Sequence, residues 1–187
     1  MAVAQFHTAT KRTRTVVAVV VGLGLLATVL FLVLGRVFGL DKRPGFFGTL
    51  APFYSDINLV VEILMVIGLT IGLFLIRNRQ RSAHQYMQTA MVLFNLVMMF
   101  FFMGIVFVQL LKPGTTISLS VIAEIFHGTI GIIAILIGLY LFLLMNNLLP
   151  KGWQIKGWKN LMRVAFGLYC VVALGGLVLY YLFFMVH

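Results

Sequence analysis

The sequence predicts an all-α integral membrane protein with five transmembrane helices. Of the 187 residues, 62% are hydrophobic and only 10% are charged, whereas a soluble domain carries about 25% charged residues. Apolar stretches of roughly 20 residues or more are typical of membrane spans. Such stretches lie at about residues 16–40, 54–76, 85–111, 117–146 and 161–186. They leave little sequence outside the bilayer, so we expect one membrane domain over residues 1–187.

The basic residues predict the orientation of these spans. The net charge of +10 could indicate nucleic-acid binding, but lysine and arginine also collect on cytoplasmic loops. With the N-terminus inside, ten basic residues fall on the inner side: Lys11, Arg12, Arg14, Arg77, Arg79, Arg81, Lys151, Lys156, Lys159 and Arg163. Four fall outside: Arg36, Lys42, Arg43 and Lys112. We therefore expect a protein of the cytoplasmic membrane of a prokaryote, with the N-terminus inside, the C-terminus outside and no nucleic-acid partner.

The connections between the spans have their own signals. The first span follows a basic cluster and is too long for a signal peptide, so it is expected to stay uncleaved. Residues 41–53 are rich in proline and glycine, which predicts a turn-rich outer loop. Residues 112–116 form a short second outer turn. The inner loop at 147–160 carries Trp153 and Trp158 beside lysines, a pattern typical of a segment at the membrane interface.

A weak internal repeat predicts how the spans pair. Val61-Glu62-Ile63-Leu64 in the second span compares with Ala123-Glu124-Ile125-Phe126 in the fourth. Spans two and three then form one helical hairpin, and spans four and five form a second in the same orientation. This predicts a four-helix bundle with the N-terminal helix added outside. Gly68 and Gly72 make a G-x-x-x-G motif, which allows helix backbones to approach closely in lipid.

Two acids inside the spans need an explanation. The chain has only four acids, and Asp41 and Asp56 are expected at segment edges. Glu62 and Glu124 instead lie roughly 10–12 Å below the outer boundary, counted at about 1.5 Å per residue. A carboxylate at that depth costs at least about 2.5 kcal/mol unless it is paired, protonated or metal-bound.

Three interpretations of this polar constellation stay open. Glu124 and His127 have the i, i+3 spacing by which bundle helices present a carboxylate and an imidazole to a metal, so Glu62, Glu124 and His127 are candidate metal ligands. A dimetal bundle needs about four carboxylates and two histidines, so this set is incomplete. The alternatives are a hydrogen-bonded polar cluster that fixes helix registry, with Asn58 beside Glu62, and a site for a quinone head group or a proton.

Haem is a further candidate cofactor. His84 and His127 differ in depth by roughly 15 Å, too far to ligate one iron together. His127 with Met99 or Met103 remains an option, because His/Met ligation is a known haem pattern. These methionines lie in a run with phenylalanines, which is also typical of packing or lipid-facing surface.

The chain resembles a known family over about residues 55–184. The basic loop from Arg77 followed by His84-Gln85-Tyr86-Met87, the intramembrane His127, and the last span ending Gly175-Gly176-Leu177 resemble the domain-of-unknown-function 420 family. Its CtaM/YozB-type members are linked to maturation of haem–copper oxidases. The family usually has further histidines near the outer end of span three and at the entry to the last span. This chain has Phe107-Val108-Gln109 and Lys159-Asn160 there.

The leading functional hypothesis is therefore a non-catalytic accessory or assembly subunit of a membrane electron-transfer complex, respiratory or photosynthetic. Its expected partners are the lipid bilayer and other membrane subunits of that complex. Two alternatives are a haem- or metal-binding membrane protein that uses Glu62, Glu124 and His127, and a small proton-linked transporter that uses the two glutamates.

Overall fold

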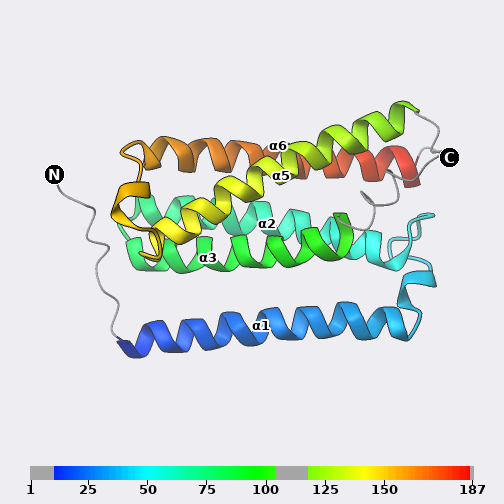
Figure 1. Cartoon of the computed structure of the whole chain (residues 1–187). Coiled ribbons are helices and arrows are strands. Elements are labelled where there is room, and N and C mark those ends of the chain that lie inside the picture. Colours follow the sequence, from blue (N-terminus) through cyan, green and yellow to red (C-terminus); the bar gives the residue numbers. More distant parts are fainter. Residues whose placement is uncertain (1–10, 104–117, 186–187) are drawn as a thin grey trace.

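Five long helices dominate the computed structural model of the chain, which describes residues 11–103 and 118–185 (Figure 1). They are α1 (Lys11–Val37), α2 (Phe53–Arg77), α3 (Arg81–Met98), α5 (Leu119–Met145) and α6 (Trp158–Phe184). Three short helical turns accompany them: η1 (Leu40–Lys42), the π-helical η2 (Met99–Met103) and η3 (Lys151–Trp153). No strand occurs in the described residues. The prediction of an all-α chain with five long apolar helices is confirmed, and each is long and apolar enough to cross a membrane.

Several helix boundaries differ from the prediction. α1 begins at Lys11 and ends at Val37, whereas a span over 16–40 was expected. It ends early because Gly39 adopts a left-handed conformation (φ 72°) that leads into η1, and glycine adopts this conformation readily. α3 and α6 begin three or four residues before the expected 85 and 161, since hydropathy marks the apolar core of a helix and not its polar first turn. The expected limits at 111 and 117 lie outside the described residues.

The helices pack in neighbouring pairs. α2 packs against α3, and α5 packs against α6; α2 also contacts α6, and α3 contacts α5 (Figure 1). Gly68 and Gly72 are buried on α2, where they face Met91 and Gln88 of α3. The small glycines therefore bring these two helices close together, as the G-x-x-x-G motif predicts.

α1 lies beside the other helices and is attached mainly near its C-terminal end (Figure 1). There Leu32 and Gly35 are buried, and the hydroxyl of Tyr54 on α2 donates a hydrogen bond of 3.1 Å to the carbonyl of Leu32. Arg36 donates to the carbonyl of Phe101 in η2, and its guanidinium lies 6.0 Å from the ring centroids of Tyr54 and Phe101. A cation over two aromatic rings and a carbonyl acceptor thus joins α1 to the other helices.

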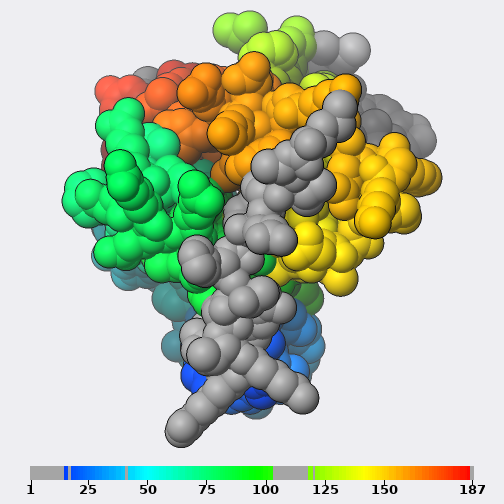
Figure 2. All heavy atoms as spheres, turned by 90° about the vertical axis from the view of Figure 1, so that its left-hand side faces the viewer, coloured from blue at the N-terminus to red at the C-terminus, as the bar shows by residue number. Residues whose placement is uncertain are grey.

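The two ends of the molecule differ in charge. At one end, here called the basic end, lie the α2–α3 turn and the α5–α6 loop, which Figure 2 shows at the surface in green and in yellow to orange. The basic end carries seven exposed cations: Arg77, Arg79, Arg81, Lys151, Lys156, Lys159 and Arg163. The opposite end, here called the Asp56 end, holds the loop between α1 and α2.

Large apolar side chains face outward along α1, α2, α5 and α6. Examples are Leu26 on α1, Phe74 on α2, Phe126 on α5 and Leu174 on α6, each more than half exposed. A soluble monomer rarely exposes such extensive apolar surface. The exterior thus has the composition expected of a surface in contact with lipid.

Candidate functional site

A cavity of about 220 Å³ lies among α2, α3, α5 and α6 and is partly open. Most of its wall is apolar, with Met65 and Leu69 from α2, Ile132 from α5 and Val172 from α6. Four polar side chains also belong to the lining: Asn58, Glu62, Asn95 and Tyr169. An apolar pocket with a few convergent polar groups is the usual form of a small-molecule site.

Glu62 is the carboxylic acid of this lining. Its Oε1 accepts a hydrogen bond of 3.0 Å from Nδ2 of Asn58, one turn earlier on α2. Its Oε2 is buried and has no hydrogen-bond partner. The carboxyl group lies against α6 at Gly176, in space that a β-carbon on residue 176 would occupy. One oxygen of this carboxyl therefore lacks the hydrogen bond that a buried polar atom normally has.

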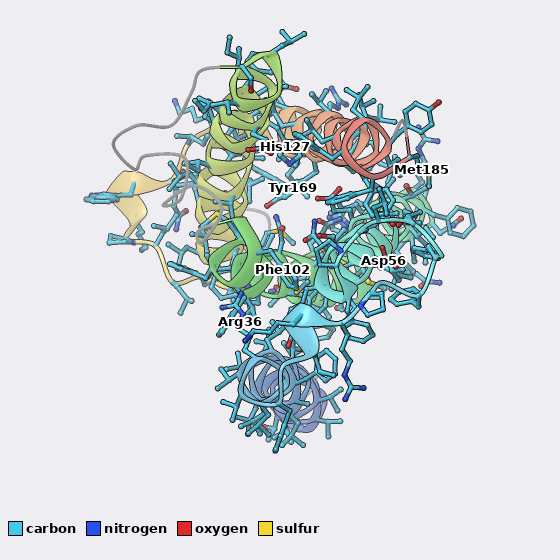
Figure 3. The ribbon with its side chains drawn as sticks, turned by 90° about the vertical axis from the view of Figure 1, so that its right-hand side faces the viewer. Arg36, Asp56, Phe102, His127, Tyr169 and Met185 are labelled. Atoms are coloured by element: carbon cyan, nitrogen blue, oxygen red, sulfur yellow. The ribbon has the colours of Figure 1, made fainter. Side chains whose placement is uncertain are left out.

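His127 lies near Glu62 but outside the cavity lining. It is 6% exposed, and its Nδ1 has no hydrogen-bond partner. This nitrogen lies 2.9 Å from the place where a β-carbon on Gly175 would be. Glu62 from α2 and His127 from α5 thus meet α6 at consecutive glycines, and Figure 3 shows His127 between α5 and α6.

Glu124 does not join them. It is half-buried and is not part of the cavity lining. No group of three or more histidine, cysteine, aspartate or glutamate side chains that could hold a metal occurs in residues 11–103 and 118–185. The metal set of Glu62, Glu124 and His127 therefore stays a prediction from spacing, and the geometry of the described chain adds nothing to it.

The two methionines predicted as haem ligands are placed differently. Met99 lines the cavity beside Met98, where methionine serves as adaptable apolar wall. Met103 ends η2, and its side chain lies outside what the structure describes. Because Nδ1 of His127 lies against α6 at Gly175 and the cavity lining does not include this histidine, the arrangement gives no support to a His127–Met99 pair.

Tyr169 and Asn95 complete the polar lining, and sequence reasoning did not select Tyr169. Tyr169 is 7% exposed, and its hydroxyl reaches α5 at Gly138. The hydroxyl makes no hydrogen bond of standard geometry, but the side chain of Asn95 lies close enough to interact with it. Figure 3 shows Tyr169 pointing into the interior. Both α3 and α6 begin at the basic end. Asn95 and Tyr169 lie at similar distances along these helices, counted in residues from the first residue of each helix. Their depths therefore agree to within about 5 Å, counted at about 1.5 Å per residue. A tyrosine inside an apolar span was the available signal.

Asp56 lies in the first turn of α2, at a segment edge as expected, and it is fully buried. It accepts a hydrogen bond of 2.9 Å from the backbone N–H of Phe47 and another from the hydroxyl of Tyr180 on α6. The same Tyr180 hydroxyl lies 2.9 Å from the hydroxyl of Thr49. This group of Asp56, Tyr180 and Thr49 fixes the α1–α2 loop to α6, so its role is structural.

His84 also differs from expectation. It follows a run of three arginines, a pattern typical of a solvated turn, but it is 3% exposed and its Nδ1 donates to the carbonyl of Gly72 over 2.7 Å. The close approach of α2 and α3 at Gly72 makes this contact reachable. His84 therefore strengthens the α2–α3 pair near the basic end.

Comparisons of the chain with protein-family models, with curated proteins and with solved structures found no match. The resemblance to the domain-of-unknown-function 420 family stays a prediction from the residues quoted above.

Proposed function

We propose that the protein spans a bilayer with its five described helices and that the basic end faces the cytoplasm. The length of the helices supports this proposal. α2 contains 25 residues and α5 contains 27 residues. At a rise of about 1.5 Å per residue, such helices are roughly 40 Å long. A hydrocarbon core is only about 30 Å thick, so both helices can cross it.

The charge of the two ends supports the orientation. Basic residues are retained on the cytoplasmic side of a membrane protein. The basic end carries seven exposed cations from two separate connections, the α2–α3 turn and the α5–α6 loop. This end is therefore the one that we place in the cytoplasm.

Labelling of single cysteines tests the orientation. In a Cys170→Ser background, Lys42→Cys and Arg79→Cys place one thiol at each end, and both native side chains are exposed. A membrane-impermeant maleimide applied to intact bacterial cells should label position 42 and reach position 79 only after permeabilisation. The reverse pattern would overturn the orientation, and labelling of both positions in intact cells would overturn the bilayer-spanning arrangement.

Within this arrangement, α2, α3, α5 and α6 form a four-helix bundle that binds a small, largely apolar molecule from the membrane. The observation that carries the proposal is the 220 Å³ cavity with its apolar wall and four polar side chains. A dry apolar cavity of about 150 Å³ is large enough to bind benzene. A molecule with one six-membered ring therefore fits the available space.

A cavity-filling variant tests this function. Gly131 lines the cavity, and no atom lies within 4 Å of where its β-carbon would be, so Gly131→Leu directs a side chain into free space. Gly167 on α6 also has free space around it and does not line the cavity. In mild detergent, 1,4-dimethylbenzene should bind the wild type and Gly167→Leu, detected by NMR saturation transfer, and should bind Gly131→Leu at least tenfold more weakly. Equal signals from all three would contradict the proposal.

A second candidate is the accessory subunit of a membrane electron-transfer complex. It is favoured by α1, whose apolar side chains such as Val20, Leu23 and Leu26 stay exposed over the length that does not pack on the other helices. Cross-linking in native membranes followed by mass spectrometry tests it. Cross-links from α1 to subunits of an oxidase or reaction centre would support this role, and cross-links confined to the chain itself would contradict it.

A further inference from the structure

We propose that the ligand of the cavity is a six-membered ring with two oxygen substituents at opposite positions, one of them a hydroxyl group that donates to Glu62. This is the chemistry of a 1,4-dihydroxybenzene ring, the head group of a reduced quinone. The inference rests on the proposed function, because it requires that the cavity binds a small molecule.

The first argument is the position of the polar groups along the helices. The Glu62 carboxyl lies level with Gly176 of α6, where the two are in contact. Tyr169 lies two turns further toward the basic end of the same helix, which corresponds to about 10 Å. Asn95 lies near the depth of Tyr169. The polar lining is therefore divided into a Glu62–Asn58 end and a Tyr169–Asn95 end.

The wall between these two ends is apolar. Met65 and Val66 of α2, Ala134 and Ile135 of α5, and Val172 of α6 line it. A six-membered ring with oxygen atoms at opposite positions can bridge the two polar ends. Each oxygen would make one hydrogen bond of about 2.7–2.8 Å, and the ring together with both bonds spans the separation. Its carbon atoms would then contact the apolar wall, and each oxygen would lie beside a polar group.

The second argument is the direction of the hydrogen bonds. At Glu62, Oε1 already accepts from Asn58, and Oε2 has no partner. The oxygen of an ionised carboxylate can only accept. In this form Glu62 requires a donor from the ligand, whereas a protonated carboxyl donates to the ligand instead. A hydroxyl group can pair with either form, and a methyl group pairs with neither. Oε2 lies against Gly176, and the terminal torsion of glutamate is soft, so rotation of the carboxyl group can present an oxygen to the cavity that Glu62 lines.

At the other end, the hydroxyl of Tyr169 lies beside the side chain of Asn95 without a hydrogen bond of standard geometry. It can donate to, or accept from, the second ligand oxygen. Asn95 belongs to the same lining, and its amide offers both a donor and an acceptor. One ligand of this class would satisfy both of the polar atoms that the lining residues leave unpartnered, which is the condition that buried polar groups normally meet.

An isosteric series of probes tests the inference on the full-length chain. 1,4-Dimethylbenzene, 4-methylphenol and 1,4-dihydroxybenzene have the same shape and carry zero, one and two hydroxyl groups. Glu62→Gln should weaken binding of 1,4-dihydroxybenzene about tenfold, because a charge-assisted hydrogen bond is lost. Tyr169→Phe should weaken it about three- to tenfold. The matched controls Glu124→Gln and Tyr181→Phe, whose side chains lie outside the lining, should change nothing.

The binding of 1,4-dimethylbenzene serves as the folding control, since neither variant should alter it. One outcome overturns the ligand class while the cavity function stands. In it, 1,4-dimethylbenzene binds the wild type but not Gly131→Leu, and neither Glu62→Gln nor Tyr169→Phe changes the affinity for the hydroxylated probes. If none of the three probes distinguishes the wild type from Gly131→Leu, the proposed function itself fails.

Discussion

The Glu62 carboxyl on α2 rests directly on the backbone of α6 at Gly176, where any side chain would overlap it. The neighbouring Gly175 leaves room in the same way for the imidazole of His127 from α5. Two polar side chains on different helices are thus accommodated only because α6 has two consecutive glycines at this depth. These glycines therefore decide how closely α6 approaches both α2 and α5.

Gly176→Ala should destabilise the protein by about 1–3 kcal/mol, the usual cost of overpacking a closely packed interior. The added methyl group would displace the Glu62 carboxyl. Gly167 on the same helix has free space around it. Gly167→Ala should therefore be neutral or stabilising by up to about 1 kcal/mol, because alanine favours helix more than glycine. Unfolding by denaturant in detergent compares the two variants, and equal stability would contradict the close approach at Gly176.

Replacing Asn58 alone should lower the free energy of unfolding more than replacing both Asn58 and Glu62. Asn58→Leu leaves the carboxyl without the hydrogen bond to Oε1. This should cost about 1–3 kcal/mol, the desolvation penalty of an unsatisfied buried group. Asn58→Leu combined with Glu62→Leu should be more stable than Asn58→Leu alone. A double-mutant cycle on unfolding free energies measures this coupling, and strictly additive effects would show that the two side chains do not interact.

Tyr180→Phe should release the α1–α2 loop. It removes the hydrogen bonds to Asp56 and Thr49, and a bond to a carboxylate contributes about 1.5–3 kcal/mol. The adjacent Tyr181 is more than half exposed, so Tyr181→Phe is the matched control. Limited proteolysis between Lys42 and Phe53 should accelerate in the first variant only. Equal cleavage rates would mean that other contacts hold the loop.

Arg36→Gln should loosen the C-terminal part of α1. The change removes a cation that donates to the carbonyl of Phe101 and lies over two rings. A loss of about 1 kcal/mol would raise amide exchange of the last turns of α1 roughly fivefold relative to α2. Arg43→Gln, at an exposed position of the loop, is the control. Unchanged exchange in Arg36→Gln would show that Tyr54 alone holds the helix.

Hydropathy was sufficient to predict the five helices, because each contains an apolar run long enough to dominate any local signal. The strong apolar character of these runs gave no indication of the polar contacts between the helices. Tyr169 and Tyr180 look like ordinary apolar-span tyrosines. The polar groups beside them, Asn95 for Tyr169 and Asp56 and Thr49 for Tyr180, lie on other helices or in a loop far away in the sequence. His84 follows three arginines, which suggested a solvated turn, but Gly72 on the neighbouring helix allows it to be buried.

The candidate site was predicted in part. Glu62 stood out because a buried acid is costly, and it lies in the cavity lining with Asn58 as its partner. Glu124 has a similar expected depth but lies outside the lining, because depth alone does not fix which side of a helix faces the interior. Asp56 is a boundary residue as predicted. Its burial was not predictable, since a loop that folds back over a helix terminus leaves no periodic pattern in the sequence.

The contact between Asp56 and Tyr180 also has a consequence for the order of events during synthesis. Tyr180 follows Asp56 by 124 residues. At about 5–20 residues per second, the ribosome makes it roughly 6–25 s later. During that interval the carboxylate has only loop atoms as partners. The α1–α2 loop can therefore be fixed only after α6 has been made, which makes this contact a marker that α6 has packed in place.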